Sequence, residues 1–338
     1  MARRGAPRYV PYHLLGGRPN LVVDGPPAPG SVLVLSHWPN SPTPARLAAD
    51  TSAEIVFCWL ATAWGRGAPE ACSNDHLDQD GLVSLFAATR PEQAWPRRRL
   101  LAEVARAGDF ACFACEEAAK VSFALASLAD PQRSPLEAAR APAPYWERCA
   151  GLYAELLGRL PELADRPEAH RWAFEEELAA YAVSRALLEA GRASLEERRD
   201  LDLAVVRLPE GLAPVEATRF FARQRWPLHP AAVYNATACS RVLFAAGRRY
   251  RLVFRYETWV RLASRRPPPR VELAGLARLL EAAEAGSCRW RADPVGDLEP
   301  QLATGPGHES SLGLGRLLGL VGAHLLRAPK AWDPWAPR

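Results

Sequence analysis

Two short apolar runs, each followed by residues at helical spacing, most strongly constrain the fold of this 338-residue chain. The first run, Ser31–Ser36, is closed by Pro39 and reads as a buried strand, and apolar residues then recur at helical spacing between Leu47 and Leu60. A weaker run over 69–73 precedes a second helix expected after Gly81. Strands that alternate with helices predict a parallel sheet, so we expect an α/β fold with N-terminal strand-helix units.

The rest of the chain predicts a helical block and a later part with a β-hairpin. Leucine and alanine recur three and four apart from about 92 to 196, which indicates helices. Residues 203–208 predict a strand, and 241–247 with 250–260 predict a hairpin that turns at Gly247. The expected organisation is an α/β domain with the candidate site over 1–130, a helical block over 131–200, and an α+β part over 201–338 packed on the first domain.

Composition argues against a dedicated nucleic-acid surface and against a membrane protein. The net charge is only +4, and nearly all of the positive charge is arginine, which indicates a compositional bias rather than a basic binding face. The apolar stretches are far shorter than the roughly 20 residues that a membrane span needs. The seven cysteines are scattered and odd in number, as in a reducing compartment, and no apolar leader follows Met1. We therefore expect a cytoplasmic protein, of open oligomeric state.

The chemistry is concentrated in the run His76-Leu-Asp-Gln-Asp-Gly81. If the run is extended, its alternation places His76, Asp78 and Asp80 on one side of the chain. Imidazole nitrogen and carboxylate oxygen are suitable ligands for Mn²⁺ and Mg²⁺. The run therefore predicts a site for a divalent metal, with manganese expected before magnesium.

Two more residues are candidate metal ligands. His37 directly follows the first strand, and parallel strands bring their carboxyl ends to one edge of a sheet, where ligands bind. A loop histidine with a backbone partner is the alternative. Asp109 follows a helix expected to end at Gly108 and precedes a short strand expected over 110–113. It could reach the same edge, or it could simply begin a loop.

Other well-known motifs do not fit. An EF-hand aligned on Gly81 would place Ala87 where the calcium loop needs a bidentate carboxylate. The chain has no Gly-Lys-Ser/Thr phosphate loop, no Gly-x-Ser-x-Gly elbow and no Gly-x-Gly-x-x-Gly run after a strand. Cys112-Phe-Ala-Cys115 lacks a second pair of zinc ligands, so we expect a structural role for it.

Three residues of the second half are candidates for substrate contact: Arg255, His308 and Glu309. Arg251, Arg255 and Glu257 alternate along the second arm of the hairpin, and arginine binds phosphate through paired hydrogen bonds. A solvated sheet face would show the same alternation. His308 and Glu309 lie in a glycine-rich turn before the last helix, where capping of that helix is the alternative. The expected ligand is a phosphorylated small molecule or a short nucleotide.

The run from His76 to Gly81, with Ser84, resembles the first motif of the DHH phosphoesterase superfamily. The loop Gly305-Pro-Gly-His308 is similar to the glycine-rich histidine loop of that superfamily's C-terminal domain. This resemblance implies that His76, Asp78 and Asp80 help to hold a pair of manganese ions, which activate water for attack on a phosphoester.

Two other interpretations stay open. No Asp-His-His tripeptide follows Gly81, which leaves a non-catalytic ligand-binding or regulatory protein with a degenerate metal loop. In a purely structural interpretation, Asp78 and Asp80 only cap the helix after Gly81.

Three segments taken together look like an uncharacterised bacterial family of unknown function. They are Ser36-His-Trp-Pro39, Asn74-Asp-His-Leu-Asp-Gln-Asp-Gly81 and Arg255-Tyr-Glu-Thr-Trp-Val260. This resemblance implies no particular activity.

Overall fold

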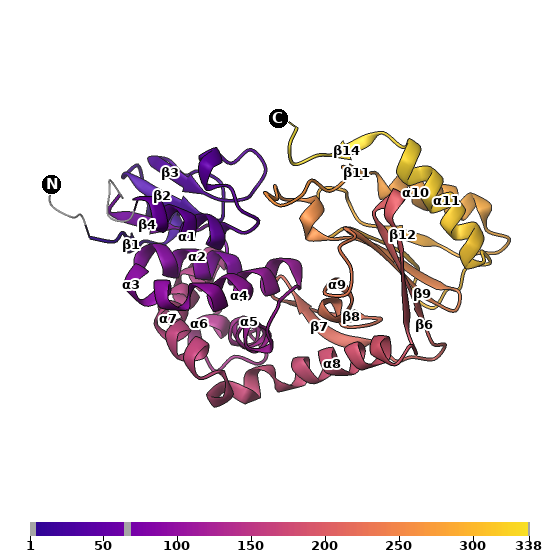
Figure 1. The fold of residues 1–338 in the computed structure, drawn as a ribbon, viewed down its shortest axis with the longest axis horizontal. Helices are drawn as coiled ribbons and strands as arrows, with labels where there is room; N and C mark the ends of the chain where they lie inside the picture. Colours follow the sequence, from indigo (N-terminus) through magenta and orange to yellow (C-terminus); the bar gives the residue numbers. More distant parts are fainter. Residues whose placement is uncertain (1–4, 64–68, 337–338) are drawn as a thin grey trace. The chain divides into compact units, whose positions relative to one another are not determined.

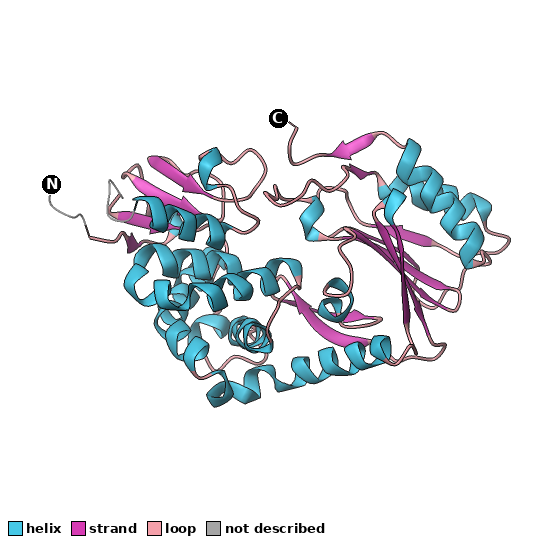
Figure 2. Ribbon diagram, in the orientation of Figure 1, coloured by secondary structure: helices cyan, strands magenta, loops and turns pink. Residues whose placement is uncertain are grey.

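The computed structural model describes residues 5–63 and 69–336, and they form two compact units (Figure 1). The boundary between the units falls within helix α8 (Arg171–Glu189). The first unit comprises Met1–Ala180, Glu216–Gln224 and Leu262–Arg265, and the second comprises Tyr181–Val215, Arg225–Arg261 and Arg266–Arg338. An N-terminal parallel sheet, a helical block and a C-terminal mixed sheet confirm the expected α/β class (Figure 2).

A four-stranded, fully parallel sheet organises the first unit, with strand order β1-β4-β2-β3. Its strands are β1 (Arg8–Tyr9), β2 (Asn20–Val23), β3 (Ser31–Leu35) and β4 (Ala71–Ser73). Alternate residues of β2 pack on opposite faces: Leu21 and Val23 belong to the main core, whereas Val22 belongs to a smaller cluster with Leu15. Both faces of this sheet are therefore covered, as is usual for parallel sheets.

Helices form the larger part of the first unit. They are α1 (Ser52–Ala63), α2 (Gln79–Thr89), α3 (Pro91–Ala94), α4 (Arg98–Phe110), α5 (Glu116–Ala129), α6 (Glu137–Arg140) and α7 (Tyr145–Asp165), followed by α8. Helix α2 contacts the sheet and also α1, α4 and α7, and its residues from Gln79 to Ala88 are all buried. A helix that is covered on every side is apolar around most of its circumference. The burial of polar residues in α2, such as Gln79 and Asp80, therefore requires a structural or functional explanation.

The second unit is built on a six-stranded mixed sheet with strand order β12-β13-β10-β9-β6-β5. These strands are β5 (Ser194–Arg198), β6 (Leu203–Leu208), β9 (Arg241–Ala246), β10 (Arg249–Phe254), β12 (Trp290–Ala292) and β13 (Gln301–Thr304). The remaining elements are β7 (Val215–Arg219), β8 (Ala222–Trp226), α9 (Pro230–Tyr234), β11 (Arg270–Val271), α10 (Leu273–Ala283), α11 (Leu314–Arg327) and β14 (Lys330–Trp332). Of these, α10 and α11 contribute to the core that covers the sheet.

The hairpin β9–β10 turns at Gly247, as expected, but its second arm is shorter than the sequence suggested. Strand β10 ends at Phe254, and Tyr256–Thr258 form a 3-10 turn. The expected alternation of Arg251, Arg255 and Glu257 on one strand face is therefore wrong. Arg255 and Glu257 are both buried and form an ion pair of 2.5 Å, because the chain turns inward where the strand ends.

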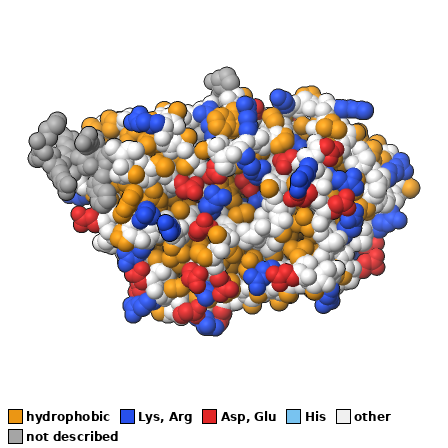
Figure 3. All heavy atoms as spheres, in the orientation of Figure 1, with side chains coloured by type: hydrophobic (Ala, Val, Ile, Leu, Met, Phe, Trp, Pro, Cys, Tyr) orange, Lys and Arg blue, Asp and Glu red, His pale blue; other side chains and the backbone are white. Residues whose placement is uncertain are grey.

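In the described part of the chain, no helix is both long and apolar enough to cross a membrane. On the face drawn in Figure 3, basic and acidic side chains of the described residues are interspersed.

Candidate metal centre

Histidine and aspartate side chains from four segments of the first unit meet beside its parallel sheet. Asp24 directly follows β2, and His37 lies two residues after β3. His76 and Asp78 lie in the loop between β4 and α2, and Asp80 lies in the first turn of α2. The carboxyl ends of parallel strands share one edge, and this brings these segments together.

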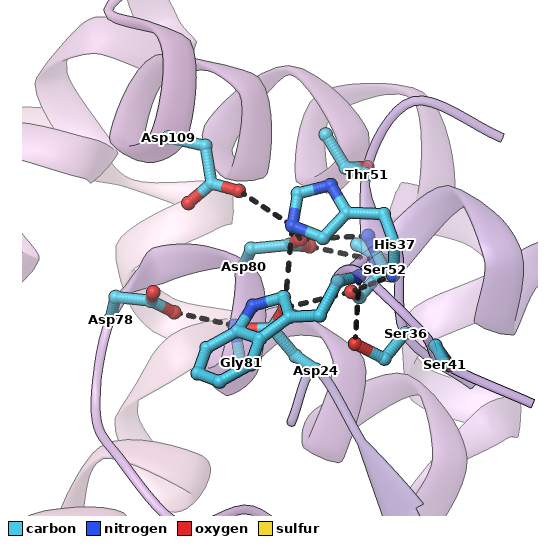
Figure 4. A network of polar contacts seen from close by, with 12 residues as sticks. Asp24, Ser36, His37, Ser41, Thr51, Ser52, Asp78, Asp80, Gly81 and Asp109 are labelled. Atoms are coloured by element: carbon cyan, nitrogen blue, oxygen red, sulfur yellow. Dashed lines mark hydrogen bonds and ion pairs between the residues drawn. The ribbon is translucent and has the colours of Figure 1, made fainter. Parts of the chain in front are cut away.

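The inner group consists of Asp24, His37 and Asp80, and all three side chains are at most 2% exposed. The Nε2 atom of His37 lies 3.6 Å from Oδ1 of Asp24 and 3.8 Å from Oδ2 of Asp80 (Figure 4). The three residues each offer one ligand atom, and these three atoms lie within 4.8 Å of one another. Their chemistry and spacing suit a divalent cation that accepts nitrogen and oxygen ligands.

The outer group consists of Asp24, His76 and Asp78, and it is closer to solvent. The Nε2 atom of His76 lies 3.0 Å from Oδ2 of Asp78 and 3.4 Å from Oδ2 of Asp24. The His76 side chain is 23% exposed and that of Asp78 is 13% exposed. On the far side of the His76 ring, Nδ1 lies 2.9 Å from Oδ1 of Asp75, which holds the ring in place.

Asp24 belongs to both groups through different oxygens. Its Oδ1 faces His37 and also accepts a 2.7 Å hydrogen bond from the Ser52 hydroxyl, while its Oδ2 faces His76. The backbone of Asp24 has φ = +48°, in the left-handed region that few residues other than glycine adopt. Such conformations are retained where function demands them. A single carboxylate thus stands between two sets of metal-capable side chains.

The run from His76 to Asp80 is not extended, so this part of the sequence-based prediction is wrong. Asp78 is the N-cap of α2 and accepts a 2.7 Å hydrogen bond from Gly81 N, so the helix has already begun at Asp80. The three side chains therefore do not converge on one point. His76 and Asp78 belong to the outer group, and Asp80 belongs to the inner group.

The structural interpretation of the two aspartates is correct in part. Asp78 caps its own helix, and Asp80 accepts hydrogen bonds of 2.7 Å from the backbone amides of Ser52 and Ala53 at the start of α1. Capping alone does not explain their other contacts, since Asp78 also faces His76 and Asp80 also faces His37. A carboxylate oxygen has two lone pairs, so one capping bond still leaves room for a metal.

His37 has the backbone partner that a structural loop histidine would have, and it also faces the inner group. Its Nδ1 lies 2.6 Å from the carbonyl oxygen of Asp50. A carbonyl oxygen can only accept, so Nδ1 carries the proton, and in the neutral ring Nε2 presents a lone pair. Nε2 is the atom that faces Asp24, Asp80 and Asp109. Histidines that bind metals are commonly held in this way, with the other ring nitrogen bonded to a carbonyl oxygen.

Asp109 joins the inner group from the end of α4. The expected strand over 110–113 is wrong, because α4 continues to Phe110 and ends where Ala111 adopts φ = +48°. The Asp109 carboxylate is buried and lies 3.4 Å from Nε2 of His37, and neither of its oxygens accepts a hydrogen bond. A buried carboxylate without hydrogen-bond donors is costly, and a cation in the inner group would compensate for it.

The crowding of carboxylates shifts their protonation equilibria. Burial, together with the charges of neighbouring aspartates, raises the pKa of both Asp80 and Asp109 well above the usual range. Burial by itself would lower the pKa of His76, but Asp78 and hydrogen bonds with Asp24 and Asp75 raise it well above its usual value. Without a metal, these side chains therefore bind protons more tightly, and the protons offset the negative charge that a cation would otherwise neutralise.

Asp24 was missed in the sequence, although a signal for it was present. Leu21-Val22-Val23 is a short apolar run with two β-branched valines, and Asp24-Gly25 ends it. A four-residue strand near the N-terminus is easily overlooked. It nevertheless places a carboxylate at the same sheet edge as His37.

The sequence matches one protein family over residues 6–334, which include almost the whole of both units. The chain belongs to DUF6687, a family of unknown function. This confirms the expected membership of a family without an assigned activity. Comparisons with curated proteins and with solved structures found no match. The candidate centre therefore has to be interpreted from its own geometry.

The candidate substrate residues all lie in the second unit, and they do not form one local cluster. Glu309 lies 3.5 Å from Arg249 at the start of β10, and His308 is its neighbour in the chain. Arg255 follows the other end of β10, where its guanidinium lies over the ring of Tyr234. A role for these residues in substrate binding stays a prediction.

Proposed function

We propose that this protein is a divalent-metal-dependent hydrolase that acts on phosphoesters, with Mn²⁺ or Mg²⁺ as its cofactor. The observation that carries this proposal is the position of Asp24, whose two carboxylate oxygens face two separate histidine-aspartate pairs. In this arrangement the inner group holds one ion, the outer group holds a second, and Asp24 lies between the two. Asp109 is the additional ligand of the inner ion.

Two bound divalent cations would lower the pKa of a water molecule and neutralise charge on phosphoryl oxygens. The protein's own residues prepare the site for this chemistry. His37 and His76 are held by Asp50 and Asp75 in orientations that direct Nε2 toward the carboxylates. The partial exposure of His76 and Asp78 leaves the outer group accessible to substrate, while the inner group is closed to solvent.

The choice of a phosphoester as the substrate is supported by the run from His76 to Gly81, which resembles the first DHH motif. A phosphorylated small molecule or a short nucleotide is the proposed substrate class.

A second candidate function is a non-catalytic, metal-dependent binding or regulatory role. The burial of the inner group favours it, because an ion enclosed by Asp24, His37 and Asp80 would be shielded from substrate. In this case the outer group would bind a ligand without hydrolysing it.

One experiment tests the primary proposal and separates it from the alternative. The protein is purified without chelator, its metal content is measured, and it is assayed with added Mn²⁺ against a panel of phosphomonoesters, phosphodiesters and short nucleotides. We expect bound metal and Mn²⁺-dependent hydrolysis that His76→Ala and Asp78→Asn both reduce by at least tenfold. Bound metal without hydrolysis would favour the binding role, and the absence of both would overturn the metal centre itself.

A further inference from the structure

Asp50 connects the inner group to a segment that is remote in sequence. It lies in the loop before α1, where its carbonyl oxygen accepts the hydrogen bond from Nδ1 of His37. Its carboxylate accepts hydrogen bonds from the backbone amides of Ala263 and Ser264, at 2.9 and 2.8 Å, and from the Ser264 hydroxyl at 2.6 Å. We call Leu262–Arg265 the strap. One residue thus contacts the candidate metal ligand through its backbone and the strap through its side chain.

The strap has an unusual place in the chain. It belongs to the first unit, whereas the residues immediately before and after it, Arg261 and Arg266, belong to the second unit. At this point the chain leaves the second unit for four residues, two of which bind Asp50.

Helix α4 is attached to the same carboxylate. Arg106 lies 3.6 Å from Oδ2 of Asp50, and it also lies 3.6 Å from Oε1 of Glu54 in α1. The same helix carries Asp109, which faces His37 from the other side. Asp50 therefore joins the strap, His37 and α4, and these contribute two of the side chains around the inner ion.

The contacts between the strap and Asp50 are at the surface and not in the packed core. Ala263 and Ser264 are exposed, and with Asp50, Phe57 and Ala102 they line an open cavity of about 570 Å³. Hydrogen bonds at an exposed site can break and re-form without unfolding the unit. Loss of the Ser264 hydroxyl would also leave the hydrophobic core intact.

We propose that Asp50 is a positioning residue for the inner metal ion, and that docking of the strap onto its carboxylate sets the orientation of His37. With the strap docked, the carbonyl oxygen of Asp50 holds the Nδ1–H of His37, and Nε2 is directed at Asp24, Asp80 and Asp109. With the strap released, the Asp50 loop loses its three hydrogen bonds and His37 loses its fixed ring orientation. The inner ion is then bound more weakly. This inference rests on the proposed metal site.

The test measures the inner ion separately from the outer one. In a His76→Ala background only the inner group is complete, and in a His37→Ala background only the outer group is complete. We expect Ser264→Ala and Asp50→Asn to weaken Mn²⁺ binding about tenfold or more in the first background, the range typical when a contact that orients a metal ligand is lost. In the second background each should change the affinity less than twofold.

Glu54→Gln is the matched control. Glu54 carries the same charge, lies four residues after Asp50 and contacts the same Arg106, but it hydrogen-bonds to the Thr51 amide and not to His37 or the strap. In each background, Glu54→Gln should change the Mn²⁺ affinity by less than twofold relative to the same background with Glu54. An equal loss in Glu54→Gln and Asp50→Asn would attribute the effect to general charge and would overturn the positioning role.

A second measurement tests the same inference without metal. The ¹⁵N chemical shifts of the His37 ring report which nitrogen carries the proton, and we expect Nδ1 to carry one in the metal-free wild type, because the Asp50 carbonyl oxygen accepts its hydrogen bond. Ser264→Ala and Asp50→Asn should convert this signal to a mixture of tautomers, while thermal unfolding and far-ultraviolet circular dichroism stay unchanged. An unchanged His37 signal in both variants would overturn the inference. If the wild type binds no metal, the proposed function fails, but this measurement still decides whether Asp50 and the strap position His37.

Discussion

The Asp109 carboxylate lies 3.4 Å from Nε2 of His37, and neither of its oxygens accepts a hydrogen bond. Burial of such a group destabilises the metal-free fold, because its hydration is lost without replacement. Proteins retain costly buried groups where function requires them. The pair Asp109–His37 therefore indicates that the inner group is arranged for a cation and not for stability.

The first prediction concerns Asp109→Asn. The neutral amide removes a negative charge from a cluster of carboxylates, so the metal-free variant should unfold at an equal or higher temperature than the wild type. Mn²⁺ affinity of the inner group should fall about tenfold, as expected for loss of an anionic ligand or its close neighbour. Thermal unfolding with and without Mn²⁺ measures both effects, and Asp200→Asn, at an exposed site of the second unit, is the control. A destabilised variant with unchanged Mn²⁺ binding would show that Asp109 is purely structural.

The second prediction concerns Asp24, which faces both groups. Asp24→Ala should strongly weaken binding at both, because it removes the carboxylate oxygen that faces each group. His37→Ala and His76→Ala should each remove one ion and keep the other. Equilibrium dialysis with Mn²⁺ and metal analysis of the dialysed protein gives the number of ions per chain. If Asp24→Ala lost only one ion, Asp24 would not be shared.

The third prediction concerns pH. The pKa values of Asp80, Asp109 and His76 are all raised in the folded, metal-free protein. The folded state therefore binds protons more tightly than the unfolded state. The two aspartates contribute stability that is fully present below about pH 3.9, and His76 contributes stability that is fully present below about pH 6.5. Each contribution is lost as the pH rises through the raised value.

The unfolding temperature of the metal-free protein should therefore be lower at pH 8 than at pH 6. Metal binding requires deprotonated ligands, so stabilisation by Mn²⁺ should increase over the same interval. Differential scanning calorimetry with chelator and with Mn²⁺ at both pH values measures the two slopes. Asp109→Asn should reduce the slope of the metal-free protein. Metal-free stability that rose from pH 6 to pH 8 would contradict the protonated cluster.

The fourth prediction compares two helical glycines of the first unit. A Cβ atom at Gly81 would collide with Nδ2 of Asn74 and would lie 2.9 Å from the Tyr153 hydroxyl. Asn74 donates to the carbonyl of Asp24 and accepts from the amide of His76, so it holds two ligand segments together. Gly81→Ala should destabilise the protein by about 1–3 kcal/mol, the usual cost of overpacking, and should also weaken Mn²⁺ binding.

Gly158→Ala is the matched control in α7, because nothing lies within 4 Å of the added methyl group. It should be neutral or stabilising by up to about 1 kcal/mol, since alanine is the better helix former. Urea unfolding of both variants gives the comparison. An unaffected Gly81→Ala would mean that Asn74 can move without loss, and that the close packing at Gly81 does not support the site.

The sequence by itself determined the α/β class and the location of the centre. The run Ser31–Ser36 and the segment before His76 read as strands, and consecutive parallel strands must end on one edge, so His37 and the His76 run had to be neighbours. The hairpin at Gly247 was equally readable, because its turn and flanking alternation are local. Local periodicity and chain connectivity suffice for such features.

Only the tertiary structure decided how the ligands are grouped. Alternating residues suggested that His76, Asp78 and Asp80 share one side, but helix α2 begins at Gln79 and rotates Asp80 toward the start of α1. Asp24 stands between the two groups because β2 lies between β4 and β3 in the sheet, an order that no local pattern encodes. Asp109 reaches His37 through the packing of α4, and Ser264 of the strap contacts Asp50 across a sequence separation of 214 residues. Contacts between distant segments depend on how whole elements pack, and that information is distributed over the entire core.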